Sequence, residues 1–193
     1  MTRIRHRFEV IDNLDPSEIS DLTVLEAVVF QMRKIVEGVA FGCLVAHENG
    51  VKAVPRDARG QWNADNILVR LAKLPVVVFP EPFIRQAAGA ESPPGVSHHL
   101  LPQKDKNISI PEMREIYRRL HVWLHEWNPY VASHIENFSE RRLLLLADLH
   151  SLRELIWSHM IGINGEIFLG IFDEDEIGHI RVVSASSNFS NVA

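Results

Sequence analysis

The chain has 193 residues, of which 46% are hydrophobic and 23% are charged, and its formal net charge is -5 at pH 7; this length and composition fit one globular domain with a complete core. The acidic balance argues against a surface that is basic overall, so any contact with RNA has to be local. No apolar run approaches the roughly 20 residues that span a bilayer, and the basic start leads into acidic sequence instead of the apolar segment of a signal peptide, so we expect a cytoplasmic protein without a membrane partner.

The first part of the chain is predicted to be mostly one long helix. Residues 3–10 mix basic with apolar side chains and are typical of a short strand or an arm. Residues 15–18, DPSE, are typical of a helix start, because aspartate caps a helix and proline suits its first turn. Apolar side chains then recur at helical spacing to about Glu48, so we expect helix over this stretch, with a break near Ser20-Asp21 left open.

The long helix also contains a charged pair and the one cysteine of the chain. Arg33 and Glu37 lie four residues apart and can pair across one helical turn. The single Cys43 excludes an internal disulfide, and its place in the apolar pattern is typical of a buried, inert thiol. A second helix is predicted from Trp62 to Leu74, with Asn63 as its N-cap.

The middle of the chain is predicted to be irregular. Val76 to Phe79 lies between prolines, which suits a short edge strand. Gln86 to Lys106 holds glycine, serine and proline without periodicity, so we expect a long loop there. The pair His98-His99 within it could bind a metal or belong to a plain polar loop, and the second interpretation is favoured.

The stretch from Ile110 to Tyr130 concentrates more polar chemistry than any other part of the chain. It is predicted to be an amphipathic helix that is capped by Ser109 and stopped by Asn128-Pro129. Its polar face carries four side chains at spacings of four, three and four residues, which places them in one stripe: Arg114, Arg118, His121 and His125. An imidazole beside a guanidinium suits acid/base work on a phosphodiester, because the first moves a proton and the second holds an anionic oxygen.

The last part is predicted to be a helix followed by a hairpin. The helix is predicted from about Ser139, its cap, to Ile163. His159 lies among the apolar side chains of this helix, and this position favours a hydrogen-bonded core histidine over a second catalytic group. Residues 166–172 and 179–184 alternate around an acidic turn, DEDE, that does not match a calcium loop. Residues 1–193 are therefore expected to form a single, mainly helical domain, a helical bundle at about 15–163 with a short C-terminal β-hairpin at about 166–184.

These features, in this order, resemble the HEPN superfamily. The segments that carry the resemblance are QMRKIVEGVAFGCLVAHE, GQWNADNILVRLAKL and IPEMREIYRRLHVWLHEWNPY, followed by a long helix that ends near His159 and by a hairpin. The resemblance covers roughly Leu22 to Val183 and implies a helical bundle that often dimerises. It also implies one of two activities, since many HEPN proteins are metal-independent ribonucleases with an R-x(4-6)-H motif from each protomer, and others bind RNA or a partner protein without catalysis.

The motif of the resembled family reaches His125 in two ways, as Arg118-x6-His125 and as Arg119-x5-His125, and Arg114-x6-His121 and Arg153-x5-His159 also match it. A separation of seven residues returns to within about 20° of the same helix direction and a separation of six leaves about 120°. Arg118 is therefore the preferred partner of His125, while Arg119 fits the family spacing equally well. Leu120 follows Arg119 where the commoner motif has a polar residue. Five further residues are expected to support the site: Arg114, His121, Asn128, Arg33 and Glu37.

The resemblance implies a definite reaction. Neutral His125 would withdraw the proton from a ribose 2'-hydroxyl, and an arginine would stabilise the charge on the phosphate oxygens. The products would be a 2',3'-cyclic phosphate and a 5'-hydroxyl, with no metal and no other cofactor. His125 of a second protomer could serve as the acid, which would make the homodimer the active form, and the resemblance points to a defence or toxin setting.

Two alternatives stay open. The polar face could be solvated and structural, in which case the chain is a non-catalytic module that binds RNA or a partner protein, through Trp123 and Trp127 or through the hairpin.

A zinc site competes for the same histidines. His121 and His125 have the i, i+4 spacing of two zinc ligands, which His134, His150 or a carboxylate could complete. HVWLH lacks the glutamate of the H-E-x-x-H hydrolases, and this favours the metal-free interpretation.

Overall fold

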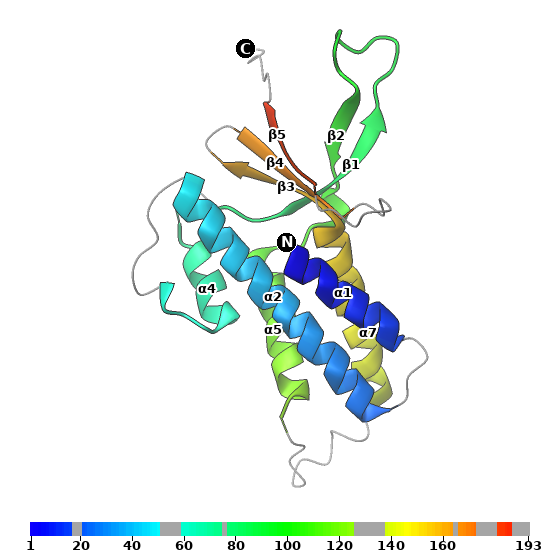
Figure 1. Ribbon diagram of the computed structural model, residues 1–193. Coiled ribbons are helices and arrows are strands. Elements are labelled where there is room, and N and C mark those ends of the chain that lie inside the picture. Colours follow the sequence, from blue (N-terminus) through cyan, green and yellow to red (C-terminus); the bar gives the residue numbers. More distant parts are fainter. Residues whose placement is uncertain are drawn as a thin grey trace.

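The computed structural model describes residues 1–16, 21–50, 59–74, 77–125, 138–163, 166–172 and 181–186, the last of these by their backbone alone. The described helices are α1 (Thr2–Leu14), α2 (Leu22–Gly50), α4 (Ala64–Leu71), α5 (Ile110–Trp123) and α7 (Phe138–Trp157), with a short 3-10 helix, η1, at Lys104–Lys106. The strands are β1 (Glu81–Ala87), β2 (His98–Pro102), β3 (Ser158–Ile163), β4 (Glu166–Ile171) and β5 (Arg181–Ser186). Figure 1 shows the helices side by side at one end of the molecule and the strands at the other.

The long helix α2 is the centre of the bundle. Its buried side chains, from Leu25 to His47, recur three and four residues apart and form one wide apolar stripe. Helices α1, α4 and α5 all pack against it. The apolar helix that the sequence predicts is therefore confirmed, although it begins at Leu22 and not near Asp15.

The N-terminal segment was predicted to be a strand or an arm, and this is wrong. Thr2–Leu14 is a helix whose Ile4, Phe8 and Ile11 are buried, while the basic residues lie between them. Gly38 of α2 allows the close approach, since a Cβ there would lie 3.0 Å from Cγ1 of Ile4. Asp15 ends this helix in the left-handed region, with φ 44°, and does not begin the next one. The N-terminal cap of α2 is Asp21 instead, whose carboxylate accepts from the backbone N–H of Thr23 at 2.8 Å.

A hairpin replaces the predicted loop in the middle of the chain. Residues 77–79 lie outside the strands, and β1 begins at Glu81. It pairs antiparallel with β2, with Phe83 opposite Pro102 and Ala87 opposite His98. Most side chains of both strands are exposed, so the alternation that would have revealed them in the sequence is absent.

The predicted helix from Ser139 to Ile163 is also divided. Helix α7 ends at Trp157, and β3 follows at Ser158 without a loop. The backbone N–H of Phe172 donates to the Trp157 carbonyl at 2.9 Å, which ties the junction to the end of β4. Ser139 lies inside the first described turn of α7 and is not its cap, because the helix is already formed at Phe138.

Two N-caps are as predicted. Asn63 accepts from the backbone N–H groups of Asp65 and Asn66 at the start of α4. Ser109 and Glu112 form a reciprocal capping box at the start of α5. Helix α5 ends at Trp123, and the predicted stop at Asn128-Pro129 lies outside the described residues.

The C-terminal strands belong to a larger sheet. The described strands form one five-stranded antiparallel sheet in the order β2-β1-β3-β4-β5. β4 pairs antiparallel with β5, but the pair is the end of this sheet and not a separate hairpin, and residues 173–180 between them are outside the described part. Among the described helices, none has the length and apolar character needed to cross a membrane.

Burial along α7 predicts a contrast between two identical substitutions. Leu152 is fully buried, with 0% of its surface exposed, whereas Leu143 on the same helix is 65% exposed. We expect Leu152→Ala to lower the free energy of unfolding by about 2–5 kcal/mol, because it removes buried methyl groups and leaves a cavity. Leu143→Ala should change it by no more than about 0.5 kcal/mol. Urea unfolding followed by circular dichroism measures both, and equal losses would contradict the packing described.

Candidate functional site

The four side chains that were expected in one stripe of α5 contact two different helices: the two arginines contact α4, and the two histidines lie toward α2. Arg114 and Arg118 turn to α4, where Arg114 Nε donates to Asp65 Oδ1 at 2.5 Å and Arg118 Nη2 to Asp65 Oδ2 at 3.3 Å. Arg118 also donates to Glu115 at 2.6 Å. The hydrogen bond from Arg114 holds the pKa of Asp65 below its usual range. Both guanidinium charges are therefore matched by carboxylates.

Arg119 lies on a different side of α5 and binds α7. Its Nε and Nη2 donate to the two carboxylate oxygens of Asp148 at 2.9 and 2.6 Å, in a two-pronged pair. Asp148 is buried, with 6% of its surface exposed. These hydrogen bonds raise the pKa of Arg119 above its already high value. Arg119 therefore joins two helices of the bundle, and it is not directed toward His125.

The two histidines meet an arginine from another helix. Arg33 of α2 donates through Nη1 to Nδ1 of His121 at 2.8 Å. Nε2 of His121 lies 2.9 Å from Nε2 of His125, and the two rings are perpendicular with centroids 4.4 Å apart. His125 follows the end of α5 at Trp123, so helical spacing does not fix its direction. The structure thus brings His125 to His121 and Arg33, and the predicted contact with Arg118 is not formed among the described residues.

These contacts require particular proton positions. A guanidinium only donates, so Nδ1 of His121 carries no proton and Nε2 of neutral His121 carries one. That proton is donated to Nε2 of His125, which must be the unprotonated nitrogen of its ring. Partial burial, together with the nearby Arg33 and His125, lowers the pKa of His121 below its ordinary value of 6.5. The geometry and the lowered pKa of His121 agree.

Glu37 holds the arginine in place. Its carboxylate accepts from Arg33 Nε at 3.2 Å, from Lys34 Nζ at 2.7 Å and from the Tyr117 hydroxyl at 3.3 Å. The predicted Arg33–Glu37 pair is confirmed, while Lys34 and Tyr117 were missed. Tyr117 occupies an apolar position of α5, where its ring lies 5.0 Å from the Arg33 guanidinium carbon, and burial raises the pKa of its hydroxyl. A tyrosine on the apolar face opposite an arginine is the signal that could have revealed it.

We refer to Arg33, Glu37, Tyr117, His121 and His125 as the histidine cluster. Two cations, Arg33 and Lys34, share the single carboxylate of Glu37, so one positive charge remains in excess beside the imidazoles. A guanidinium has five N–H donors, and the contacts to Glu37 and His121 occupy two of them. The cluster can therefore hold an anionic oxygen and exchange a proton at an imidazole.

Metal ligands are not gathered at this site. Among the described residues, no group of three or more histidine, cysteine or acidic side chains could hold a metal ion. Both ring nitrogens of His121 already contact Arg33 and His125. His134, a suggested third ligand, and Asn128, a suggested supporting residue, lie outside the described part of the chain.

The remaining histidines singled out in the sequence are also placed. His98 and His99 belong to β2, where His99 contacts the Ser92 hydroxyl at 2.9 Å. His159 is buried and hydrogen-bonded to the Ile156 carbonyl at 2.8 Å, which confirms a hydrogen-bonded core histidine, although on a strand. Cys43 is buried, as predicted, and burial raises the pKa of its thiol to about 12.

Comparisons of the chain with models of known protein families, with curated proteins and with solved structures found no match.

The Arg119–Asp148 pair predicts an asymmetry that a catalytic arginine would not produce. We expect Arg119→Leu to lower the free energy of unfolding by about 1–3 kcal/mol, because it leaves the buried carboxylate of Asp148 without its partner. Adding Asp148→Leu to this variant should recover most of the loss, since no buried charge then remains. Chemical unfolding of the two single variants and the double variant gives the coupling energy. Unchanged stability in Arg119→Leu would contradict a structural role for this pair.

The lowered pKa of His121 predicts how its titration responds to charge. We expect Arg33→Leu to move the pKa of His121 upward, toward its ordinary value of about 6.5, because a neighbouring cation is removed. The control Arg3→Leu removes an equal charge from an exposed position on α1 and should leave the titration unchanged. Because the folded pKa is depressed, the contribution of His121 to stability is complete above about pH 6.5 and declines as the pH falls toward the folded pKa. NMR titration of the histidine ring protons measures the shift.

Proposed function

We propose that the chain is a metal-independent ribonuclease on a HEPN-like helical bundle, with His125, His121 and Arg33 as its working groups. The observation that carries this proposal is the hydrogen-bonded row from Arg33 through His121 to His125. Both imidazoles are exposed, so a polynucleotide can reach them. The excess positive charge of Arg33 and Lys34 over Glu37 suits a phosphate, and this local charge is compatible with the acidic chain as a whole.

The proposed chemistry begins at Nε2 of His125. A ribose 2'-hydroxyl takes the place of His121 at this nitrogen and gives up its proton to it, and the 2'-oxygen attacks the adjacent phosphorus. The N–H of His121 that is released and the remaining N–H groups of Arg33 then donate to the phosphate oxygens. The bond from phosphorus to the 5'-oxygen breaks, leaving a 2',3'-cyclic phosphate. In a homodimer, His125 of the partner subunit would supply the proton that the 5'-oxygen takes up.

In this proposal, Arg118 and Arg119 of the sequence motif do not contact the phosphate that is cleaved. Arg33 replaces Arg118 as the group that faces the phosphate, because Arg33 is the arginine in contact with the imidazoles. Arg118 is half exposed and Arg114 lies beside it on Asp65, so both can contact the RNA backbone away from the cleavage point. Arg119 stabilises the bundle, and Asn128 keeps the supporting role that the HEPN resemblance implies. A defence or toxin setting is proposed from that resemblance alone.

A non-catalytic interaction module is the second candidate. A groove of about 220 Å³ lies between α5 and α7 and includes Leu120, Val122 and Leu144 among its walls. Val122, Leu144 and the neighbouring Leu143 are 49%, 46% and 65% exposed, so they form an apolar surface beside the groove. Such a surface is typical of a site for a partner protein.

Cleavage of a structured-RNA pool in excess EDTA tests the proposal. We expect wild-type protein to leave 2',3'-cyclic phosphate ends and His125→Ala to be at least about 100-fold slower, since a general base contributes at least that factor. His98→Ala, an exposed histidine on β2, is the matched control and should cleave like wild type. Arg33→Lys keeps the charge but loses the forked geometry, so it should retain only part of the activity.

The two candidates diverge in this experiment. Cleavage that survives in His125→Ala, or that requires a divalent metal, contradicts the ribonuclease. Absence of cleavage by wild type, combined with capture of a protein partner that Leu143→Asp and Leu144→Asp abolish and His125→Ala does not, supports the interaction module.

A further inference from the structure

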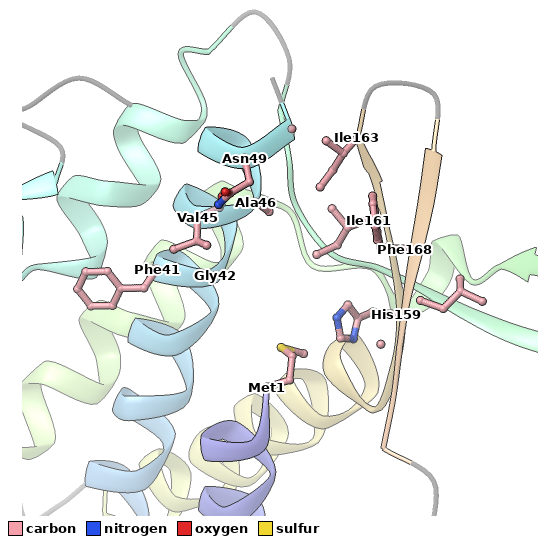
Figure 2. Close-up of a pocket in the computed structure, with 13 residues that line it drawn as sticks. Met1, Phe41, Gly42, Val45, Ala46, Asn49, His159, Ile161, Ile163 and Phe168 are labelled. Atoms are coloured by element: carbon pink, nitrogen blue, oxygen red, sulfur yellow. The ribbon is translucent and has the colours of Figure 1, made fainter. Parts of the chain in front are cut away.

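A second site lies between α2 and the sheet, away from the histidine cluster. The pocket there has a volume of about 520 Å³, which falls in the range of small-molecule sites. Figure 2 shows α2 along one wall, with Val45 and Asn49, and the strands along the other, with Ile161 and Phe168. None of the side chains that line it is acidic or basic apart from His159, so its walls are almost entirely apolar.

Small side chains on α2 leave this space open. Gly42, Val45, Ala46 and Asn49 are spaced by three and four residues, so they share one face of the helix, and this face lines the pocket. A Cβ added at Gly42 would meet nothing within 4 Å. Glycine inside a helix costs about 0.5–1 kcal/mol relative to alanine. A larger residue at this position would be accepted by the helix and would enter the pocket.

His159 supplies one polar atom to this apolar space. Its side chain is 3% exposed, and Nδ1 donates its proton to the Ile156 carbonyl at 2.8 Å, so Nε2 is the nitrogen with the lone pair. Within the described part of the chain, Nε2 makes no hydrogen bond. The ring lies directly against Gly170, which leaves room for it, since a Cβ there would come within 2.3 Å of Cε1 of the imidazole. Burial, together with the nearby ammonium group of Met1, lowers the pKa of His159, which keeps Nε2 an acceptor.

A water molecule at Nε2 of His159 would find few other partners in this pocket. A buried water molecule makes two to four hydrogen bonds to the protein. Beside His159 the side chains of Met1, Ile161 and Phe168 offer no donor or acceptor other than sulfur. The polar groups at this wall are Asn49, one of whose N–H groups donates to the Val45 carbonyl at 2.7 Å, and the terminal ammonium group of Met1. A molecule that fills the apolar volume and brings one donor satisfies both the walls and the imidazole.

We propose that this pocket binds a small, neutral and largely apolar molecule that carries a hydroxyl group, and that the hydroxyl donates to Nε2 of His159. The apolar body of the ligand lies against Gly42, Val45, Ile161 and Phe168. The binding does not depend on the proposed ribonuclease, because it uses none of the residues of the histidine cluster.

A pair of probes that differ by one hydroxyl group tests the proposal. Binding of 2-naphthol and of naphthalene to the full chain is measured by the fluorescence of the probes. We expect 2-naphthol to bind about tenfold more tightly than naphthalene, which is the factor that one net hydrogen bond supplies. In His159→Phe the two probes should bind equally, since phenylalanine fills the same space without an acceptor. His125→Ala should bind both probes as wild type does.

Closing the pocket supplies an independent test, which stays decisive if His159→Phe fails to fold. We expect Gly42→Leu to reduce the binding of both probes at least tenfold. Gly60→Leu is the matched control, because a Cβ at Gly60 also meets nothing within 4 Å, and it should bind like wild type. Circular dichroism and thermal unfolding check that both variants are folded. Equal binding of the two probes to wild type, absence of saturable binding, or full binding by Gly42→Leu would each overturn the proposal.

Discussion

Burial of α2 is the constraint on which most of this structure depends. The helix buries side chains along its whole length, and α1, α4 and α5 are held together by covering it. Burial of apolar surface is worth roughly 25 cal/mol per Å², so this helix contributes a large share of the core. The same helix carries Arg33 and Glu37 on one side and Gly42 and Val45 on another. Both proposed sites thus include side chains of the same well-packed helix, which helps to position them.

Most of the arginines in α5 serve the fold. Arg114 and Arg118 both form ion pairs with Asp65 of α4, and Arg119 forms an ion pair with Asp148 of α7. The exposed pairs contribute little free energy, but a charge that is already matched by a carboxylate is less available to an anionic ligand. What distinguishes Arg33 is that it shares its carboxylate with Lys34 and still reaches an imidazole. A count of basic residues would therefore overstate the positive surface of this helix.

The sequence predicts the buried faces better than the contacts between them. The apolar periodicity of α2 and the caps at Asn63 and Ser109 depend on local rules, and the structure has them as expected. The hairpin of β1 and β2 was missed because exposed strands have no alternating pattern. The predicted contact of Arg118 or Arg119 with His125 is not formed among the described residues, since α5 ends before His125 and the partner of Arg119 lies 29 positions away in the sequence. Nothing local in the sequence encodes either of these distant contacts.

The direct passage from α7 into β3 has a mechanical consequence. A connecting loop would let the sheet tilt against the bundle, but here the last residue of the helix, Trp157, is covalently followed by the first residue of the strand. The hydrogen bond from Phe172 to the same residue adds a second attachment to β4. These two attachments limit how far the sheet can tilt relative to α7 on this side of the molecule. A force applied to the strands is transmitted along α7 to its far end instead of being absorbed where the two layers meet.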